Sequence, residues 1–374
     1  MSSLLTTPNT NQRWSGRKAS GSPTRAGALL AMFGSRHRGN WWARGLGWVL
    51  GWACIFFGVL VAQAQTETSP LAEDISTATL VHPDDTVWEF STRCHPETCQ
   101  VMESRLAVRR MIGCRWETTT YEDLLQDLTN TSLDSSAAGG PRTIVYVHGN
   151  WTEDTVARSR GLLVYQRMRE FDPPAMRFII YSWPSARDHG VIKDIYAKAA
   201  RLDFEAFVLA TLLRQLPASQ SVGLIGFSFG GAITAGALHL DAGGSWGPYR
   251  LSGKPPERRV HVTWLAPAFD RDALRPNGEF ELALRQCDRV VNYYNSCDPV
   301  LKRFRLIDPQ TRPEAAGFAG LPLGRTVTGR FPLASNRDIE QFNCCCTIGR
   351  THSEESYLRC LCHHPRGLIH LTLP

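Results

Sequence analysis

Residues 222–231, VGLIGFSFGG, decide the fold that this sequence predicts. Val222–Ile225 is a short apolar run typical of a buried strand, and a G-x-S-x-G motif centred on Ser228 follows it directly. Two glycines are needed in such a motif because the chain turns sharply from a strand into a helix, with the serine at a strained apex. That turn lifts the Ser228 hydroxyl clear of the sheet. The alternative is a glycine-rich turn in which the serine only caps the helix.

Further apolar runs lie on both sides of this motif and alternate with helical segments. The runs are Thr143–Val147, Arg177–Tyr181, Arg259–Leu265 and Arg289–Tyr294. Short, nearly continuous apolar runs rich in Val and Ile are typical of strands covered on both faces. The clearest helical stripe runs from Ile195 to Leu216 and ends at Pro217. The alternation predicts an α/β fold with a mostly parallel, doubly wound sheet.

The strand before the motif ends in a second turn of chemical interest. Thr143–Val147 is followed by the sequence HGNW, residues 148–151, after which a helix is expected to open. In a parallel sheet the carboxyl ends of the strands lie at one edge, so this turn should lie near Ser228. A backbone N–H group there can stabilise an oxyanion together with the first amides of the helix after Ser228. We interpret His148 itself as structural.

An acid and a histidine follow Ser228 in the chain order that nucleophilic catalysis on this kind of sheet requires. Asp298 comes just after the strand Arg289–Tyr294, where a carboxylate can orient a histidine and stabilise its cation. His352 lies further on, in a polar loop that opens a short helix. The pattern favours Ser228 as nucleophile, His352 as base and Asp298 as acid.

Residues from about 143 to 360 closely resemble an esterase/lipase-like branch of the α/β-hydrolase superfamily. The resemblance is carried by the segments HGN (148–150), SWPS (182–185), GFSFGG (226–231), LAPAFD (265–270), NSCDPVL (295–301) and THSEESYL (351–358). It implies a serine hydrolase that cleaves a small-molecule carboxylic ester with the triad Ser228, Asp298 and His352. It also implies oxyanion amides at Asn150 or Trp151 and at Phe229. We expect no cofactor and no metal.

Several assignments have alternatives. Asp270 follows the preceding strand and is the alternative acid, because some hydrolases place their acid there. Rivals to His352 lie near the C-terminus; they are His363, His364 and His370. Trp183 is expected to line the substrate pocket or to belong to the core. A second hypothesis is an inactive hydrolase-fold protein with a binding or structural role in the cell envelope, because fold does not imply function. The long interval between Asp298 and His352 motivates it.

The charge of the chain is concentrated at its N-terminal end. The 374 residues include 41 basic and 35 acidic side chains, a net charge of +6, and 43% are apolar, which is enough for a sizeable core. Seven basic and no acidic residues precede Glu67, so 34 basic and 35 acidic residues follow, a net charge of −1. A basic surface would attract polyanions. Because the excess lies in the leader, we expect no nucleic-acid partner.

Residues 45–62 form an uncharged run of 18 residues after Arg44, and Ala62-Gln63-Ala64 ends it with small residues. This pattern predicts an export signal cleaved after Ala64, or a single-pass membrane anchor if the leader is retained. The protein is therefore expected to be exported, whether periplasmic, secreted or associated with the envelope. The predicted segments are a basic disordered n-region (1–44), a signal or anchor (45–64), a linker (65–86), N-terminal strands and a loop joined to the core (87–142) and the α/β-hydrolase domain (143–374).

Cysteine usage agrees with export. Of eleven cysteines one lies in the leader, which leaves an even ten. An even count in an exported chain favours disulfide bonds, whose connectivity the sequence leaves open. The cysteine-rich C-terminal segment contains Cys344-Cys345-Cys346 and Cys360-x-Cys362-His363-His364, which could also hold a metal. Zinc ligands are usually spaced by two to four residues rather than adjacent, so the disulfide interpretation is favoured.

Overall fold

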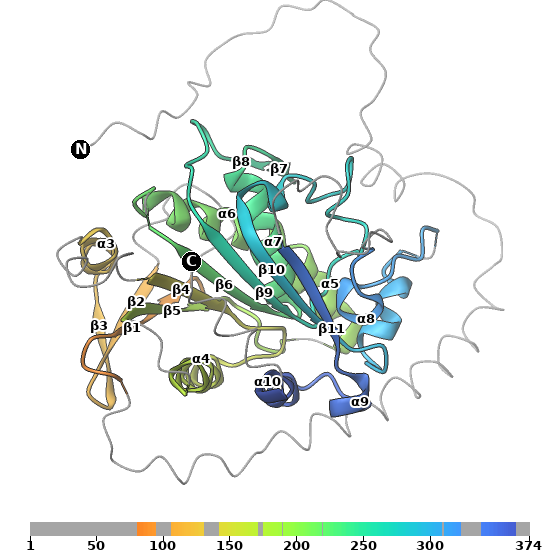
Figure 1. Ribbon diagram of the computed structural model, residues 1–374, viewed down its shortest axis with the longest axis horizontal. Coiled ribbons are helices and arrows are strands. Elements are labelled where there is room, and N and C mark those ends of the chain that lie inside the picture. Colours follow the sequence, from red (N-terminus) through yellow and green to blue (C-terminus); the bar gives the residue numbers. More distant parts are fainter. Residues whose placement is uncertain are drawn as a thin grey trace, which may run out of the picture. The chain divides into compact units, whose positions relative to one another are not determined.

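A nine-stranded sheet forms the centre of the described part of the chain (Figure 1). In the order in which they lie side by side, its strands are β11 (Asp338–Asn343), β10 (Cys287–Tyr294), β9 (Val260–Leu265), β6 (Val222–Phe227), β4 (Arg142–Val147), β5 (Met176–Ser182), β1 (Thr86–Ser91), β2 (Ala107–Ile112) and β3 (Arg115–Thr119). The pairs from β11 to β1 are all parallel, and β2 and β3 extend the edge antiparallel. The predicted mostly parallel α/β sheet is confirmed.

The structure is a computed structural model. It describes residues 81–94, 106–130, 142–170, 175–188, 190–218, 220–308, 310–322 and 338–363. These residues all belong to one unit, Thr77–Pro374. The predicted n-region, the signal or anchor segment and residues 65–80 of the linker lie outside the described residues. In the part of the chain that is described, no helix is long and apolar enough to cross a membrane.

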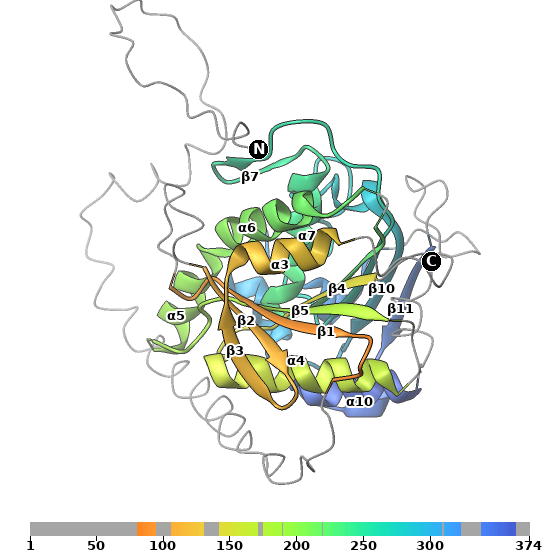
Figure 2. The same ribbon diagram turned by 90° about the vertical axis from the view of Figure 1, so that its left-hand side faces the viewer.

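Helices cover both faces of the sheet. In chain order they are α3 (Tyr121–Thr129), α4 (Asp154–Arg169), α5 (Val191–Ala199), α6 (Leu202–Gln215), α7 (Phe229–Asp241), α8 (Ala316–Ala319), α9 (Cys345–Ile348) and α10 (Glu354–His363), with 3-10 turns η6 (Ala283–Gln286) and η7 (Leu301–Leu306). Figures 1 and 2 show α6 and α7 on one face and α4 and α10 on the other. This double cover explains why β4, β5 and β6 are buried along their whole length.

Small residues let the helix after Ser228 approach the sheet closely. Every residue of α7 is buried, because the helix lies between the sheet and its neighbour α6. A Cβ atom at Gly236 would lie 2.4 Å from the ring of Trp246 and 3.0 Å from the Cβ of Ala206. Larger side chains would push α7 away from these neighbours and move the residues at its first turn, where Ser228 lies.

The stripe from Ile195 to Leu216 forms two helices rather than one. Helix α5 ends at Ala199 and α6 begins at Leu202, with Arg201 at its N-cap. The Arg201 guanidinium donates to Glu205 Oε1 over 2.6 Å, and both side chains are buried. Ile195 and Ala199 of α5 are partly buried against the core and the apolar residues of α6 are buried, so the spacing in the sequence does not reveal the break.

Two edge strands were not among the predicted runs. Strand β11 begins near the end of the segment Arg305–Gln341, which has the composition of an insert, and it pairs parallel with β10 in register from Arg289 opposite Asp338. Strand β3 pairs only with β2. Edge strands contact one neighbour and are partly exposed, so their sequences lack the continuous apolar runs of the central strands. A small hairpin, β7 (Ser245–Trp246) and β8 (Tyr249–Arg250), lies within residues 243–258.

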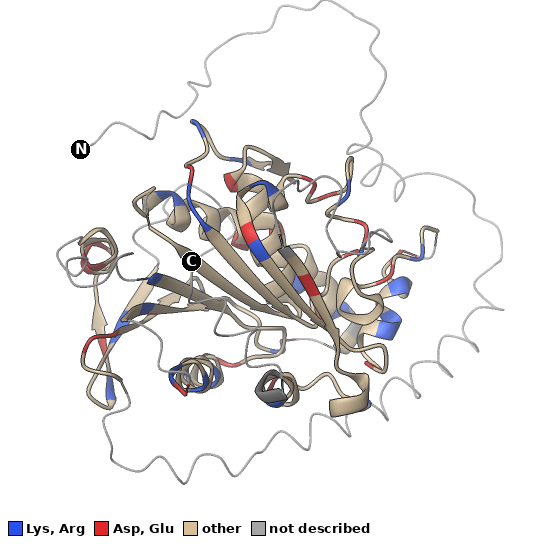
Figure 3. Ribbon diagram, in the orientation of Figure 1, with Lys and Arg blue, Asp and Glu red and all other residues tan. Residues whose placement is uncertain are grey.

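Charged residues of both signs are spread over the helices and loops of the described unit. Figure 3 shows blue and red residues interspersed on the outer elements, whereas β6 is tan along its length. Several buried acidic groups are paired with arginine. Glu89, for example, accepts from Arg109 over 2.6 Å and from Arg158 over 3.1 Å. These pairs join β1 and β2 to α4, so the N-terminal strands are part of the same core as the parallel sheet.

Candidate active site

Ser228 lies at the apex of the turn from β6 into α7. Its φ of 53° and ψ of −117° are unusual for a residue with a side chain. The Ser228 N–H donates to Leu265 O over 3.0 Å, and its carbonyl accepts from the Ala268 N–H over 3.0 Å. The neighbouring end of β9 therefore holds the apex from two sides, and the strained conformation predicted from the sequence is present.

The glycines of the motif are required because neighbouring parts of the chain pack too closely against them to leave room for a Cβ atom. A Cβ at Gly226 would lie 2.6 Å from the carbonyl oxygen of Gly230. A Cβ at Gly230 would lie 2.1 Å from the carbonyl oxygen of Val147, and one at Gly231 would lie 2.7 Å from Pro267. No real Cβ contact is this short. The first turn of α7 is thus packed against the ends of β4 and β9, which fixes the position of Ser228.

Ser228, His352 and Asp298 form one hydrogen-bonded line. The Nε2 atom of His352 lies 3.0 Å from Ser228 Oγ, and its Nδ1 atom lies 2.6 Å from Asp298 Oδ2. Asp298 is fully buried, Ser228 is 8% exposed, and the His352 side chain is 15% exposed. The three side chains chosen from the sequence are therefore brought together, with the histidine reaching between the other two.

The Asp298 carboxylate is held by more than His352. Its Oδ1 atom accepts from the backbone N–H groups of Val300 and Leu301 over 2.8 and 2.9 Å. The Tyr357 hydroxyl lies 3.3 Å from Oδ2, and burial together with the charge of Asp298 raises the pKa of Tyr357 well above its usual value. Oδ1 is thus occupied by the backbone, which directs Oδ2 to the histidine.

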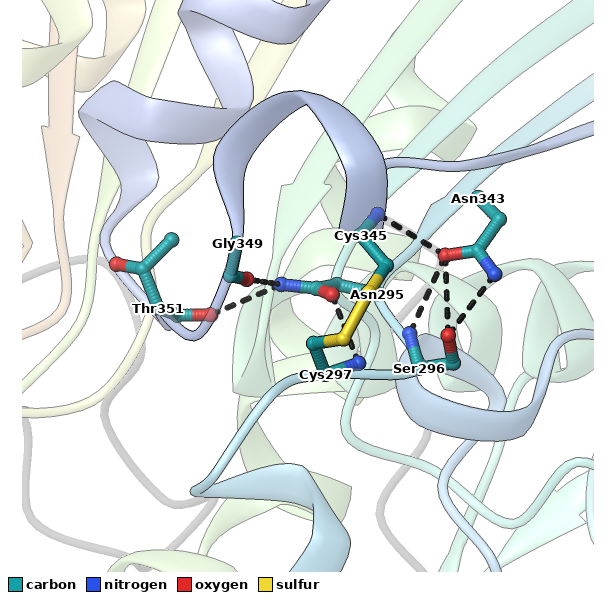
Figure 4. The surroundings of a disulfide bond; sticks show 7 residues. All are labelled: Asn295, Ser296, Cys297, Asn343, Cys345, Gly349 and Thr351. Atoms are coloured by element: carbon teal, nitrogen blue, oxygen red, sulfur yellow. Dashed lines mark hydrogen bonds between the residues drawn. A yellow bond between two sulfur atoms is a disulfide. The ribbon is translucent and has the colours of Figure 1, made fainter.

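The loop that carries His352 is tied to the loop that carries Asp298. The Asn295 side-chain amide donates to Gly349 O over 2.8 Å and to Thr351 O over 3.2 Å, and its Oδ1 accepts from the Cys297 N–H over 2.9 Å (Figure 4). Asn295 thereby fixes the chain immediately before His352. Just after it, the Glu354 carboxylate accepts from the Tyr146 hydroxyl of β4. Both sides of the histidine are anchored.

A disulfide bond joins the same two loops. Cys297, which precedes Asp298, is bonded to Cys345 at the start of α9, with Cα atoms 5.3 Å apart (Figure 4). The predicted disulfide bonding is confirmed for this pair. The other described cysteine side chains are not in bonded pairs, namely Cys94, Cys114, Cys287, Cys344, Cys346 and Cys360. Cys99 and the side chain of Cys362 lie outside what the structure describes.

The turn after β4 is held by a buried histidine. Burial and the nearby Arg93 lower the pKa of His148 to about 3, so the ring is neutral. Its Nδ1 lies 2.9 Å from Gly149 O, and its Nε2 accepts from the Trp183 N–H over 3.3 Å. Arg93 also donates to Thr152 O over 2.9 Å. His148 is therefore a structural residue in the hydrogen bonding of the turn.

This turn lies directly beside the serine. A Cβ at Gly149 would lie 3.2 Å from Ser228 Cβ, so the turn and the apex are in contact. Trp151 has a φ of 56°, and its indole donates to the buried Asp194 over 2.7 Å. Within the described residues, the backbone N–H groups of Asn150, Trp151 and Phe229 donate to no protein acceptor. These are the amides that the resemblance implied as oxyanion donors.

The remaining candidates lie elsewhere. Trp183 is fully buried, stacks on His148 at 5.8 Å and donates from its indole to the His148 carbonyl, so it supports the turn from behind. Asp270 accepts from the Asp272 N–H, and its isolated bridge to Ala315 is at a different loop. His364, His370 and the side chain of His363 lie outside the described residues.

Sequence reasoning did not identify Asn295, Tyr357 and Glu354, which position the acid and the histidine, or Arg93, which supports the turn after β4. Asn295 and Tyr357 belong to segments that carried the resemblance, which was the available signal. No group of three or more His, Cys, Asp or Glu side chains is arranged to hold a metal ion in the described residues.

The strand order, the serine apex between β6 and α7, and the acid after β10 define an α/β-hydrolase fold, as the resemblance implied. Sequence comparisons add nothing to this assignment, since the chain matches no protein-family model and no curated protein. The assignment follows from the arrangement of the sheet and the geometry of the turn.

Some solved structures with related arrangements are named as esterases or thioesterases. One is an inhibited esterase B from Lactobacillus rhamnosis, which is 11% identical, covers 86% of this chain and 96% of its own, and has a TM-score of 0.35. Another is acyl-protein thioesterase 2 from Zea mays, at 16% identity, 62% and 95% coverage and a TM-score of 0.30.

Proposed function

We propose that this protein is a serine hydrolase that cleaves a carboxylic ester through an acyl-enzyme formed on Ser228. The observation that carries the proposal is the continuous line from Ser228 Oγ through His352 to the buried Asp298, with distances of 3.0 and 2.6 Å. A serine that only capped α7 would need neither a strained apex nor a histidine within hydrogen-bond distance. The geometry is that of an activated nucleophile.

In the first step the Ser228 hydroxyl attacks the ester carbonyl carbon while His352 Nε2 accepts its proton. Asp298 holds the Nδ1–H tautomer and stabilises the imidazolium cation. The tetrahedral intermediate then collapses, the C–O bond to the alcohol breaks, and His352 returns the proton to the leaving oxygen. A water molecule, deprotonated by His352, attacks the acyl-enzyme and releases the carboxylic acid and Ser228.

Backbone amides would stabilise the negative charge that develops on the carbonyl oxygen. The Phe229 N–H belongs to the first turn of α7, where unpaired amides and the helix dipole favour an anion. The second donor is the N–H of Asn150 or Trp151 in the adjacent turn. Removing one oxyanion donor typically lowers turnover by about 10²–10³-fold. The neutral His148 beneath this turn keeps an additional positive charge away from the site.

We propose esters as the substrate class because, compared with amides, they have the better leaving group for a site of this kind. An alkoxide leaving group is displaced more readily than an amine, and the described site shows a single base to protonate it. Thioesters use the same steps, so the test includes both classes. Small-molecule acyl esters of short, medium and long chains would define the preference.

The test is covalent labelling of the purified full chain with a fluorophosphonate, together with hydrolysis of the ester series. Wild type should be labelled at Ser228 and should hydrolyse at least one ester. Ser228→Ala should lose both. The matched control is Ser159→Ala, since Ser159 is an exposed serine on α4 that is remote from the apex. Labelling of Ser228→Ala equal to that of wild type would remove the proposal. Absence of both labelling and turnover in wild type would favour the inactive binding or structural role.

We also propose that the protein acts outside the cytoplasm. The uncharged segment 45–62 after Arg44 and the Cys297–Cys345 disulfide both support export, because disulfides persist mainly in oxidising compartments. Fractionation of expressing cells should find the chain outside the cytoplasm. The mass of its N-terminal peptide distinguishes cleavage after Ala64 from retention of the leader as an anchor. Recovery of the full-length chain in the cytoplasmic fraction contradicts export.

A further inference from the structure

Two buried cysteines face one another beside the candidate site. Cys344 follows β11 directly, and Cys360 lies in α10; their side chains are 0% and 1% exposed. Their sulfur atoms are 2.7 Å apart, which is closer than two sulfur atoms that are merely in van der Waals contact. The end of β11 and helix α10, which lie on either side of His352 in the sequence, thus bring a pair of thiols together in the core.

The surroundings of this pair connect it to the acid. Cys360 lies three residues after Tyr357 on α10, so the two side chains are neighbours on one face of the helix, and the Cys344 N–H donates to Tyr294 O of β10 over 2.8 Å. The hydroxyl of Tyr357 in turn lies 3.3 Å from Asp298 Oδ2. The thiol pair is therefore one side chain away from the carboxylate that orients His352.

Cys345, the residue after Cys344, already forms a disulfide bond to a different part of the chain. Cys345 is bonded to Cys297, next to Asp298. We propose that Cys344 and Cys360 form a second disulfide. Of two consecutive residues, Cys345 would then be bonded to the Asp298 loop and Cys344 to α10, the helix that follows His352. The second bridge would close a loop whose ends are 16 residues apart and which contains His352. Both loops would then be fixed at one point.

The bridge forms by thiol–disulfide exchange while the segment is still accessible during folding. Either cysteine can attack as its thiolate, Cys360 for example. The oxidant is the disulfide of a thiol–disulfide exchange protein or of a small molecule. Its S–S bond breaks, a mixed disulfide forms on Cys360, and Cys344 displaces the second sulfur. Two electrons and two protons leave the cysteine pair, and the oxidant is reduced to two thiols.

Peptide mapping tests the pairing directly. The full chain, purified without reductant, is denatured, alkylated and digested with trypsin, which cuts after Arg350 and Arg359 and so separates the two cysteines. The experiment uses the variant Cys346→Ser/Cys362→Ser, so that each peptide has defined cysteines. We expect the peptide containing Cys344 and Cys345 to be joined to both the Cys297 peptide and the Cys360 peptide. Complete alkylation of Cys344 and Cys360 would overturn the proposal.

Cys287 is the internal control in this experiment. It is buried like the pair, and its sulfur donates to Ala283 O over 3.3 Å. Alkylation of Cys287 after denaturation shows that burial alone does not protect a thiol. If Cys287 is alkylated and Cys344 and Cys360 are not, the pairing stands.

The effect on the site rests on the proposed function and is measured separately. The variant Cys344→Ser/Cys360→Ser should melt several degrees below wild type, because the closed loop no longer restricts the unfolded chain. Labelling of Ser228 should slow about tenfold, since the His352 loop is held less firmly. Cys287→Ala is the matched buried control and should keep the wild-type labelling rate. If the Cys344–Cys360 bridge is mapped but Ser228 is never labelled, the proposed function is refuted and the disulfide proposal stands. If Ser228 is labelled but no bridge is found, the disulfide proposal is refuted and the proposed function stands.

Discussion

The serine half of the candidate site is held by its backbone, whereas the half that carries the acid and the histidine is held by side chains and a disulfide. Around Ser228 the chain approaches itself so closely that glycine is required at positions 226 and 230. Around His352 the support comes from Asn295, Glu354 and the Cys297–Cys345 bond. These two means of support differ in how they should respond to mutation.

Backbone packing leaves little room for adjustment, because the atoms in contact cannot rotate away. A single methyl group in the serine half should therefore disrupt the site completely. Side-chain support is distributed over several contacts, so loss of one contact should weaken the acid–base half by degrees. Substitutions in the two halves test this difference.

The largest effect is expected for Gly230→Ala. The new Cβ would lie 2.1 Å from the Val147 carbonyl oxygen, so α7 must move away from β4 and carry Ser228 with it. We expect destabilisation of at least about 3 kcal/mol in urea denaturation and no fluorophosphonate labelling. Gly190→Ala is the matched control, because a Cβ there meets nothing within 4 Å. A Gly230→Ala protein with wild-type stability and labelling would show that the turn is not sterically determined.

Asp298→Asn should come next. The Asn carbonyl oxygen can accept from Val300 and Leu301 as Oδ1 of the acid does, which leaves the amide NH₂ facing His352. The histidine would then hold its proton on the nitrogen that must accept from Ser228. By analogy with other serine triads, we expect the labelling rate to fall by about 10⁴-fold with the fold intact.

Asp270→Asn is the control for this substitution, since it changes the alternative acid in the same way. We expect it to keep the wild-type rate, because its carboxylate accepts from Asp272 rather than from the histidine. A large loss for Asp270→Asn with none for Asp298→Asn would assign the acid to the other strand end. Circular dichroism on both variants establishes that each protein is folded.

The same difference explains how much the sequence could predict. The serine half is local: strand, glycines and serine occupy residues 222–231, and the steric requirement is visible in the motif itself. Strands β4, β5, β6, β9 and β10 were predictable for a related reason, because burial on both faces imposes a continuous apolar run on each.

The acid–base half could be predicted only in part. The chain order of the acid and the histidine favoured Asp298 and His352. Their supports were not visible, because the contacts of Asn295 with Gly349 and Thr351 join residues more than fifty positions apart. A contact of that kind imposes no periodicity on either segment. The break between α5 and α6 was missed for a different reason: the helix is interrupted between Ala199 and Leu202, while the apolar residues on both sides of the break still pack against the core.

The neutral histidine beneath the serine half predicts a pH dependence of stability. The folded-state pKa of His148 is about 3, and that of a histidine in the unfolded chain is about 6.5. Below pH 6.5 the unfolded state therefore binds a proton that the folded state does not, so this contribution to stability is lost as the pH falls. Between pH 7 and pH 5 the loss should be about 2 kcal/mol.

The measurement is urea denaturation of wild type and His148→Gln at both pH values. Glutamine retains one donor and one acceptor but cannot be protonated in this range, so the variant should lose about 2 kcal/mol less than wild type over the same interval. His82→Gln, at an exposed histidine, is the control and should follow wild type. Equal losses in His148→Gln and wild type would mean that the buried ring does not act as a neutral support.

The smallest of these effects is expected for Asn295→Ala, in the half held by side chains. The substitution removes the donors to Gly349 O and Thr351 O but leaves the Cys297–Cys345 bond and Glu354 in place. Loss of about 1.4 kcal/mol of positioning corresponds to a decrease of about tenfold in kcat, with KM nearly unchanged because Asn295 lies behind the histidine. Ser296→Ala, at the next and exposed residue, should change kcat by less than about twofold. A loss of kcat for Asn295→Ala as complete as that for Gly230→Ala would show that a single contact controls the His352 loop and that the two halves are equally rigid.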